Sequence, residues 1–438
     1  MIITPQACYH ISMNPKKVVK KVIPKVAVTP AKSIYRKGRG VVWQTRYGFP
    51  AKSLKMIAVT GTNGKTTTAS YVNSVLKASG LKTAVYTTAY YEIDDERVPN
   101  NTHMTVASQK SVQRFFASAK KSGVDWVILE VTSHALHQGR IAGLKPDIGI
   151  ITNLSQEHLD YHKTMEDYAH AKASLFTKYG AKTAILNHDD KWHKFFSDNI
   201  YQKQLSFGEN DDARVKLKNV ELNADGSKFE VLADGKRIKL STSLLGKFNI
   251  YNALCAVTVG LEIGLEPEKI KKGIADLKSV PGRMEEIDEG QNFTVLVDFA
   301  ITPDALENAL STLRTVTRGK LAIVFGATGD RDPTKRRPMG EIVAELADRI
   351  YLTDDETYTE DPKSIRDAVY VGIASKNARS NTQVFDDRLE AIKQSFADAK
   401  RGDTVLLTGI GHENYRNMGG KKLPWDEREI ARKLLKDL

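Results

Sequence analysis

A glycine-rich loop between an apolar run and an amphipathic run is the feature that most constrains the fold of this chain. The apolar run covers residues 56–60, and the loop is Gly61-Thr62-Asn63-Gly64-Lys65-Thr66. Residues 66–79 follow with apolar side chains at helical spacing and stop at Gly80. Strand, tight loop and helix in this order form the repeating unit of parallel sheets, so we expect an α/β protein.

The loop has the chemistry of a phosphate site. Its glycines let backbone N–H groups turn toward phosphate oxygens, and the start of a helix adds partial positive charge. Lys65 can reach terminal phosphates, and the Thr66 hydroxyl can hold Mg²⁺. Val59 stands where the full GxxxxGK[ST] pattern has its first glycine, so the loop is a shortened variant. A plain strand-to-helix turn would need neither Lys65 nor Thr66, and phosphate binding is the favoured interpretation.

Further strands of the same sheet are predicted downstream. Short apolar runs between helical patterns place them at 126–131, 148–152 and 183–186. Residues 215–245 differ, because Asp-Gly turns separate alternating runs there. Such turns indicate antiparallel hairpins, which we expect as a small sheet appended to the parallel one.

The pattern restarts after Val280-Pro281-Gly282, where a domain boundary is expected. Thr302-Pro303-Asp304 is a typical helix start, with a capping hydroxyl and a proline at the first helical position. The later strands are predicted at 294–299, 321–325, 350–353 and 404–407. We therefore predict a basic N-terminal extension (1–54), a central P-loop-type ATPase domain with the appended sheet (55–282) and a C-terminal Rossmann-like α/β domain (283–438).

Composition excludes several classes of protein. Cys8 and Cys255 are too few for a disulfide scaffold or a paired-cysteine metal site, and no run of 18 apolar residues could span a bilayer. We expect a soluble, cytoplasmic protein. The net charge of +12 comes from the first 56 residues, which hold twelve Lys and Arg and no acid, so the rest of the chain is balanced.

The basic extension has three interpretations. Its run 16–23 looks helical but is cut short by Pro24. A solvated, partly ordered arm is favoured, and peripheral contact with anionic lipid at the inner face of the membrane comes second. Nucleic acid is not expected as a partner.

Two residues at or beyond the ends of predicted strands, Glu130 and His158, are candidate metal ligands. Glu130 ends a strand of the buried type, where a charge needs a partner or a metal. His158 follows the next strand, and taken alone it is an ordinary loop histidine. The carboxyl ends of parallel strands share one edge of a sheet, so both are expected on the same side as Lys65.

At this point the chain resembles the Mur ligase family, most of all the members that add the third residue of the peptidoglycan stem peptide. The resemblance covers roughly residues 55–438. Its segments, in order, are 60–68, 130–140 (EVTSHALHQGR), 152–162 (TNLSQEHLDYH), 166–176 (EDYAHAKASLF), 246–252 (GKFNIYN), 280–285 (VPGRME), 297–306, 326–340 and 409–413. It implies an ATP- and Mg²⁺-dependent ligase that joins a free amino acid to a UDP-muramoyl-peptide-like cell-wall precursor through an acyl-phosphate, in peptidoglycan synthesis, cell shape and division.

The resemblance also implies roles for individual residues. Catalytic roles fall to Lys65, His158 and Lys172, of which Lys172 matches a carbamylated lysine. The metal ligands are Thr66, Glu130, His158 and carbamylated Lys172. Nucleotide contacts fall to Gly61, Thr62, Asn63, Gly64, Lys65, Thr66, Thr67, Asn249, Asn252, Arg283, Asp298 and Arg331, of which the last three close over nucleotide or amino acid. Substrate contacts fall to Thr105, Thr132, Gln138, Arg140, Asp355, Glu356, Tyr358, Gly409 and Glu413. By helical position alone, Lys172 would be an ordinary exposed lysine.

Four departures from the family pattern bear on substrate. Only about 55 residues precede the loop, so the usual uridine-diphosphate-gripping domain is expected to be missing or replaced. The amino-acid selector Asp-Asn-Pro-Arg reads Asp355-Glu356-Thr357-Tyr358, and tyrosine cannot grip a carboxylate bidentately as arginine does. Diaminopimelate specificity is therefore not carried over, and Glu356 is expected to attract a side-chain amine such as that of lysine or ornithine. The other departures are Ile301 for a histidine, Ile410 for a lysine and Val106 for a proline.

Three alternatives stay open from the sequence. One is a related ligase acting on another carboxylate, either folylpolyglutamate-type or on a lipid-linked precursor. Another is a catalytically impaired homologue that still binds ATP. The third is a nucleotide-binding protein that uses its basic arm to recruit partners. Lys65, Glu130, His158 and Lys172 are all present, which favours an active enzyme.

Overall fold

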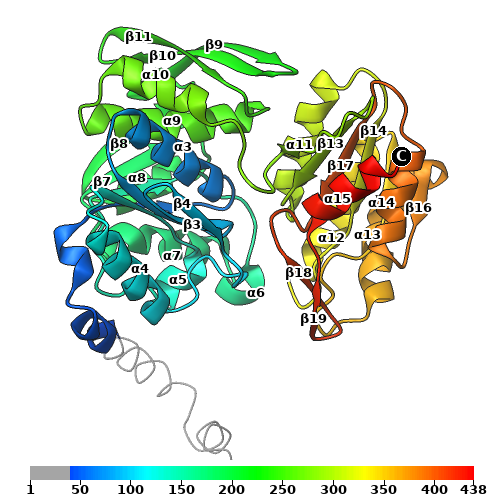
Figure 1. Ribbon diagram of the computed structural model, residues 1–438, viewed down its shortest axis with the longest axis horizontal. Helices are drawn as coiled ribbons and strands as arrows, with labels where there is room; N and C mark the ends of the chain where they lie inside the picture. The colour runs from blue at the N-terminus through cyan, green and yellow to red at the C-terminus, as the bar shows by residue number, and fades with distance from the viewer. Residues whose placement is uncertain (1–39) are drawn as a thin grey trace, which may run out of the picture.

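The computed structural model describes residues 40–438, which form two α/β units, one around each of two large sheets (Figure 1). The predicted α/β class is confirmed. Each of the eight strands expected in the two parallel sheets is present, with ends within one residue of the prediction. Residues 1–39, most of the predicted basic extension with its run 16–23, lie outside the described part. The domain limits 55–282 and 283–438 stay a prediction.

The first sheet has eleven strands, and its middle is parallel. In spatial order they are β11 (Lys236–Thr242), β10 (Gly226–Ala233), β9 (Val215–Asn223), β8 (Lys203–Gly208), β7 (Thr183–Asn187), β6 (Ile148–Ile151), β1 (Lys55–Thr60), β5 (Trp126–Glu130), β2 (Thr83–Tyr86), β3 (Tyr90–Ile93) and β4 (Glu96–Pro99). Because β1, β5 and β6 run parallel side by side, their carboxyl ends and the loops that follow meet at one edge.

Helices cover both faces of this sheet, which explains why its central strands are apolar throughout. One core packs α3 (Lys65–Ala78), α9 (Lys247–Glu262) and α10 (Pro267–Asp276) against the sheet. The opposite core packs α4 (Gln109–Lys121), α5 (Ser133–His137), α7 (Met165–Thr177) and α8 (His193–Asn199). This double cover holds the strand ends rigidly in place.

The edges of the first sheet differ from the expectation in two ways. The hairpins of β9, β10 and β11 are present, but they continue the main sheet, because β9 pairs in parallel with β8 at Phe207↔Val215. At the other edge, β3 and β4 form a hairpin that was not predicted. β4 is exposed along its whole length and ends in Pro99, so it carries no alternating pattern to recognise.

The second sheet has the order β12 (Glu285–Glu286), β13 (Thr294–Asp298), β17 (Thr404–Thr408), β14 (Leu321–Phe325), β15 (Arg349–Leu352) and β16 (Thr382–Val384). One core packs α11 (Pro303–Val316), α12 (Arg336–Leu346) and α13 (Pro362–Ser375) against it, and the other packs α14 (Arg388–Ala397) and α15 (Glu427–Lys436). The predicted cap is confirmed, since Thr302 accepts a hydrogen bond from Ala305 N–H at the start of α11. A hairpin of β18 (Tyr415–Met418) and β19 (Lys421–Pro424) projects from this unit.

None of the helices within residues 40–438 has the length and apolar character needed to cross a membrane.

Candidate active site

The glycine loop is shaped by close contacts that leave no room for side chains. Gly64 has φ 79, and a Cβ there would lie 2.2 Å from Oδ1 of Asn252. A Cβ on Gly61 would lie 1.8 Å from Oγ1 of Thr152. The loop therefore needs glycine at both positions for space, and at Gly64 also for its left-handed backbone. Lys65 folds back over the loop, where its ammonium donates to the Thr62 carbonyl at 2.7 Å.

Thr62 and Asn63 tie the loop to the segment after β6. The Thr62 hydroxyl donates to the Ser155 carbonyl at 3.2 Å and accepts from Ser155 N–H at 3.0 Å. Asn63 N–H donates to Oδ1 of Asn153 at 2.9 Å. These bonds fix the loop relative to the segment that carries His158.

Glu130 is buried at the end of β5 and is fully oriented by hydrogen bonds. The Thr66 hydroxyl donates to its Oε2 at 2.9 Å, and Thr88 donates to both oxygens, through N–H at 2.9 Å and through its hydroxyl at 3.0 Å. Thr67 is buried in the same first turn of α3. A carboxylate and a hydroxyl therefore lie side by side next to the phosphate loop.

His158 stands in the loop after β6, at the start of α6 (Leu159–His162), with φ 58. Burial lowers its pKa, and the charges of Lys172 and Lys65 lower it further, against the opposing effect of Glu157. The imidazole is thus neutral near pH 7, with a nitrogen lone pair available for a metal.

Glu157 was missed by sequence reasoning. Burial alone would raise the pKa of its carboxyl, but His158 in its protonated form and the ammonium groups of Lys335, Lys65 and Lys172 hold that pKa below its usual value. Its Oε2 lies 3.6 Å from Nε2 of His158. An acid directly before a candidate ligand, in a loop at the carboxyl end of a strand, was the available signal.

The expectation that Lys172 is exposed, drawn from its helical position alone, is wrong. Its side chain is 1% exposed, and its ammonium lies 4.3 Å from the centre of the Tyr168 ring. Burial lowers the pKa of Lys172 well below its usual value, and the charge of Lys65 lowers it further. Lys172 points into the sheet edge because α7 turns this face toward the phosphate loop, where Tyr168 bonds Thr62.

Lys65, Glu130 and His158 share one electrostatic neighbourhood. Burial lowers the pKa of Lys65, and Glu130 and Glu157 oppose that effect. The charge of Lys65 acts in turn on His158. Hydrogen bonds place them at the expected edge, because Thr66, next to Lys65, bonds Glu130 and Thr62 bonds Ser155 in the loop that carries His158.

Two asparagines lie behind the loop on α9. Asn252 accepts from the Thr68 hydroxyl at 3.2 Å and donates to Asn249 at 3.0 Å. Asn249 donates to the Leu245 carbonyl at 2.8 Å. Both are buried, so they shape the wall beside the loop.

Arg283 and Asp298 bring the second unit to the phosphate loop. A guanidinium nitrogen of Arg283 donates to the Thr66 hydroxyl at 3.4 Å, and its plane lies over Phe299. Asp298 accepts from Met284 N–H at 2.7 Å, and burial raises the pKa of its carboxyl to about 6. The guanidinium of Arg283, from the second unit, therefore contacts the glycine loop at Thr66.

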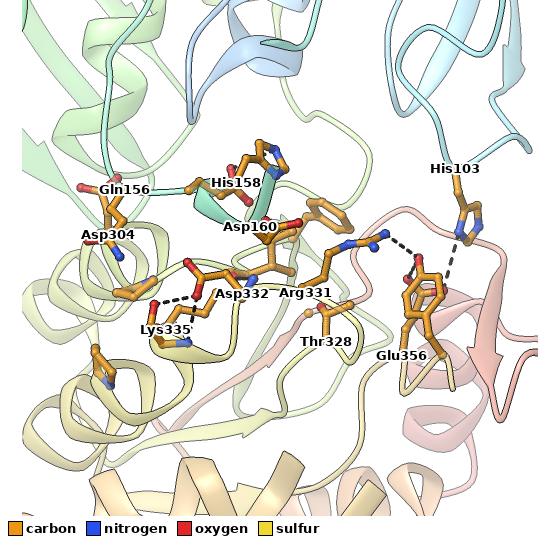
Figure 2. A pocket seen from close by; sticks show the side chains of 18 of the residues that line it. His103, Gln156, His158, Asp160, Asp304, Thr328, Arg331, Asp332, Lys335 and Glu356 are labelled. Atoms are coloured by element: carbon orange, nitrogen blue, oxygen red, sulfur yellow. Dashed lines mark hydrogen bonds and ion pairs between the residues drawn. The ribbon is translucent and has the colours of Figure 1, made fainter. Parts of the chain in front are cut away.

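A cavity of about 330 Å³ lies between the units. Figure 2 shows Gln156 and Asp304 at one end, His103 with Glu356 at the other, and His158 between them. Across the gap, Asn63 donates to Oδ2 of Asp304 at 2.6 Å. The residues that line it include His103, Gln156, Glu157, His158, Asp160, Asp304, Arg331, Asp332, Lys335, Glu356, Tyr358, Gly409 and Glu413.

The predicted substrate residues of the second unit fall into two groups, those that line the cavity and one that does not. Glu356, Tyr358, Gly409 and Glu413 line the cavity. Asp355 is directed elsewhere, because its carboxylate pairs with buried Arg388 at 2.8 Å.

Arg331 also lines the cavity, but it is turned toward Tyr358. It donates to the tyrosine hydroxyl at 3.3 Å and lies 4.7 Å from the ring centre. Lys335, which sequence reasoning missed, has its ammonium on the Ile301 carbonyl at 2.9 Å.

The four predicted donor-substrate residues of the first unit lie in two segments: Thr105 follows β4, whereas Thr132, Gln138 and Arg140 flank α5, after β5. Thr105 contacts the Thr88 hydroxyl that orients Glu130, at 2.5 Å. Gln138 accepts from Arg140 at 2.6 and 3.0 Å. Thr132 caps α5 through Ala135 N–H.

The donor set fits Mg²⁺. A magnesium ion prefers hard oxygen ligands and keeps few of them from the protein. Thr66 and Glu130 present such oxygens 2.9 Å apart, beside a loop built for phosphate.

The chain matches two family models, the Mur ligase middle domain over residues 59–260 and the Mur ligase, glutamate ligase domain over residues 282–411. It is 38% identical over 409 residues to the UDP-N-acetylmuramoyl-L-alanyl-D-glutamate–2,6-diaminopimelate ligase of Geobacillus kaustophilus, covering 92% of this chain and 83% of that protein. The Streptomyces coelicolor protein of the same name is 40% identical, with 91% and 79% covered.

Solved structures of Mur ligases and of a folylpolyglutamate synthase have the same fold as this chain. That of a UDP-N-acetylmuramoyl-L-alanyl-D-glutamate–2,6-diaminopimelate ligase aligns with a TM-score of 0.61 and 32% identity, covering 88% of this chain and 79% of that one. A Mycobacterium tuberculosis folylpolyglutamate synthase shares the fold, with a TM-score of 0.69 and 19% identity over 85% and 92%. The fold, the phosphate loop and these relatives define an ATP-dependent enzyme that forms amide bonds. The chain belongs to the Mur ligase family.

Proposed function

We propose that this enzyme joins a free amino acid to the terminal carboxylate of a UDP-muramoyl-peptide-like precursor, as a step in peptidoglycan synthesis in the cytoplasm. The observation that carries the proposal is the bonded pair of Thr66 and Glu130 beside Lys65, next to a cavity lined by both units. The names of its relatives describe the same reaction on diaminopimelate.

The chemistry begins with a poor electrophile, the carboxylate. Its oxygen attacks the γ-phosphorus of ATP, ADP leaves, and an acyl-phosphate forms. The amine then attacks the acyl carbon, and phosphate leaves with the former carboxylate oxygen. Lys65 stabilises the charge that develops on the transferred phosphoryl group, and closure of the second unit excludes water from the acyl-phosphate.

Thr66, Glu130 and His158 would hold Mg²⁺, which supplies charge neutralisation at the phosphates when bound. Lys172 supports a further role. Its burial favours the uncharged amine, the form that combines with carbon dioxide to give a carbamate and a proton. As a carbamate, Lys172 would add an anionic oxygen ligand.

The remaining predicted residues are assigned by position. Asn249 and Asn252 would lie along the adenine, while Arg283, Asp298 and Arg331 would close over nucleotide and amino acid. Thr105, Thr132, Gln138 and Arg140 would hold the peptide precursor near Glu130. Asp355 is proposed to act through Arg388 rather than by touching substrate.

For the incoming amino acid, we propose one with a side-chain amine, such as lysine or ornithine. Glu356 and Glu413 both line the cavity, so this end of it is acidic. Arg331 donates to the Tyr358 hydroxyl, and this hydroxyl donates to Oε2 of Glu356 at 3.1 Å, so the tyrosine stands between the guanidinium and the acid. An ammonium group is attracted by this arrangement, whereas a second carboxylate on the side chain is repelled.

The test is product analysis with the purified chain, ATP, UDP-muramoyl-dipeptide and an equal mixture of lysine, ornithine and diaminopimelate. We expect ADP release that depends on both the precursor and an amino acid, and a product mass increased by lysine or ornithine. ADP release that ignores both substrates would reject the ligase proposal. A product containing mainly diaminopimelate would reject only the amino-acid assignment.

A further inference from the structure

Three side chains gather at the end of the cavity away from the phosphate loop: His103, Glu356 and Glu413. One ligand atom of each lies within 4.8 Å of the others. Nδ1 of His103 is 3.0 Å from Oε2 of Glu413 and 4.0 Å from Oε1 of Glu356. His103 follows β4 in the first unit, whereas the two glutamates follow β15 and β17 in the second. The cluster therefore joins the two units.

His103 is held rigidly toward the acids. Its ring stacks on Tyr415 with centres 3.4 Å apart and planes 8° from parallel, and its backbone has φ 51. Its side chain is 8% exposed; Nδ1 has the Glu413 carboxylate as its partner, and Nε2 is buried without a hydrogen bond. Nδ1 is therefore directed at the two carboxylates, and a neutral ring nitrogen among carboxylate oxygens is a typical arrangement of metal ligands.

The carboxylate of Glu356 is bonded by neutral donors, because it accepts from the Tyr358 hydroxyl at 3.1 Å and from Asn417 N–H at 3.0 Å. Within residues 40–438, neither Glu356 nor Glu413 forms an ion pair with a lysine or arginine. The pair is therefore set up to accept a cation.

We propose that His103, Glu356 and Glu413 form a second metal site, for a divalent transition ion such as Zn²⁺, separate from the magnesium site at the phosphate loop. Zinc accepts imidazole and carboxylate ligands, and three protein ligands leave a fourth position open. Zinc–ligand bonds of about 2.0–2.2 Å place tetrahedral ligand atoms roughly 3.3–3.6 Å apart, between the two distances found here. The imidazole disfavours magnesium, which prefers oxygen ligands.

This site has a consequence for regulation that rests on the proposed function. The ion would occupy the same acids that are proposed to attract the side-chain amine of the amino acid. It would also draw its ligands from both units and hold them together. Zinc is therefore an inhibitor that competes with the amino acid.

The binding test uses metal-free full-length protein titrated with Zn²⁺ by calorimetry, and with Co²⁺ by visible absorption, in excess Mg²⁺. We expect one ion per chain and an affinity at least about tenfold weaker in both His103→Gln and Glu413→Gln. His170→Gln is the matched control, since His170 is exposed on α7, and it should bind as the wild type does. Equal affinity in His103→Gln and the wild type would overturn the site.

A second measurement covers the case in which a variant unfolds. X-ray absorption of zinc-loaded wild type should show one imidazole and oxygen ligands. Two or more imidazoles would instead place the ion among His134, His137 and His162, whose rings pack together, and would overturn the proposal.

Competition is tested by initial rates at several zinc concentrations. We expect the KM for the amino acid to rise with zinc while kcat is unchanged. Inhibition that lowers kcat alone would overturn the regulatory claim. Zinc binding lost in His103→Gln, in a protein that ligates no amino acid, would leave the metal site standing and reject the proposed function.

Discussion

The Thr66 hydroxyl donates a 2.9 Å hydrogen bond to Oε2 of Glu130, which joins the first turn of α3 to the carboxyl end of β5. Glu130→Gln keeps the shape of this side chain and removes its charge. We expect the Mg²⁺ concentration needed for half-maximal activity to rise at least about tenfold, because a neutral amide is a weaker ligand. Activity measured across a magnesium titration checks this. An unchanged magnesium dependence would contradict the assignment of Glu130.

Lys65→Ala should lower kcat by about 100-fold or more, since it removes a charge that stabilises the transferred phosphoryl group. Steady-state ADP release measures the effect. Lys228→Ala is the matched control, because Lys228 is exposed on β10. A Lys65→Ala enzyme with near wild-type kcat would place phosphate binding elsewhere.

Lys172→Ala should be slow and partly restored by small carboxylate salts such as acetate. The added anion would replace the carbamate oxygen proposed for Lys172. The same assay with chloride at equal ionic strength is the control. Wild-type rates without any additive would remove the carbamate from the mechanism.

Stability also reports on Lys172. Its folded-state pKa lies below the usual 10.5 because the side chain is buried. At a pH between the folded-state pKa and 10.5, Lys172 is protonated in the unfolded chain and not in the folded one. Its contribution to the free energy of unfolding therefore rises with pH. Lys172→Met should therefore be more stable than the wild type at pH 7, and the gap should shrink toward pH 10 by up to about 1.4 kcal/mol per pH unit.

The measurement is urea unfolding in buffer free of carbon dioxide. Lys121→Met, at an exposed position of α4, is the control and should show no such pH-dependent gap. A constant difference between Lys172→Met and the wild type across pH would contradict the burial argument.

Asp355 and Glu356 are neighbours with different expected roles. Arg388 is fully buried between Asp355 and Glu427, so Arg388→Ala should lower the free energy of unfolding by about 3–5 kcal/mol. Asp355→Asn should likewise lower the melting temperature.

Glu356→Gln should instead raise the KM for the amino acid with little effect on the melting temperature. Thermal unfolding and steady-state kinetics of both variants separate the roles, and the reverse pattern would contradict them.

Much of the fold could be predicted because its central strands are buried on both faces. Runs such as Leu321–Phe325 are continuously apolar, and the turn residues mark their ends. The β3–β4 hairpin could not be predicted, since β4 is fully exposed. The pairing of β9 with β8 could not be predicted either, because only two residue pairs join these strands and such a short contact leaves no sequence pattern.

The candidate site was predictable where local chemistry is distinctive. Lys65, Thr66, Glu130 and His158 follow strands of one sheet, so sheet geometry brings them together. The burial of Lys172 depends on how α7 packs, and Lys335 and His103 reach the cavity from distant segments. Such contacts depend on tertiary packing, which the period of a helix or strand does not encode.

The central claim is that the acceptor carboxylate is activated by phosphoryl transfer at the Lys65 loop. The most direct measurement uses a precursor with ¹⁸O in its terminal carboxylate, together with ATP and the accepted amino acid. The mechanism predicts that each turnover releases phosphate carrying one labelled oxygen, because that oxygen leaves with phosphorus when the amine attacks. Amide product formed with unlabelled phosphate would contradict the acyl-phosphate, and with it the role given to this site.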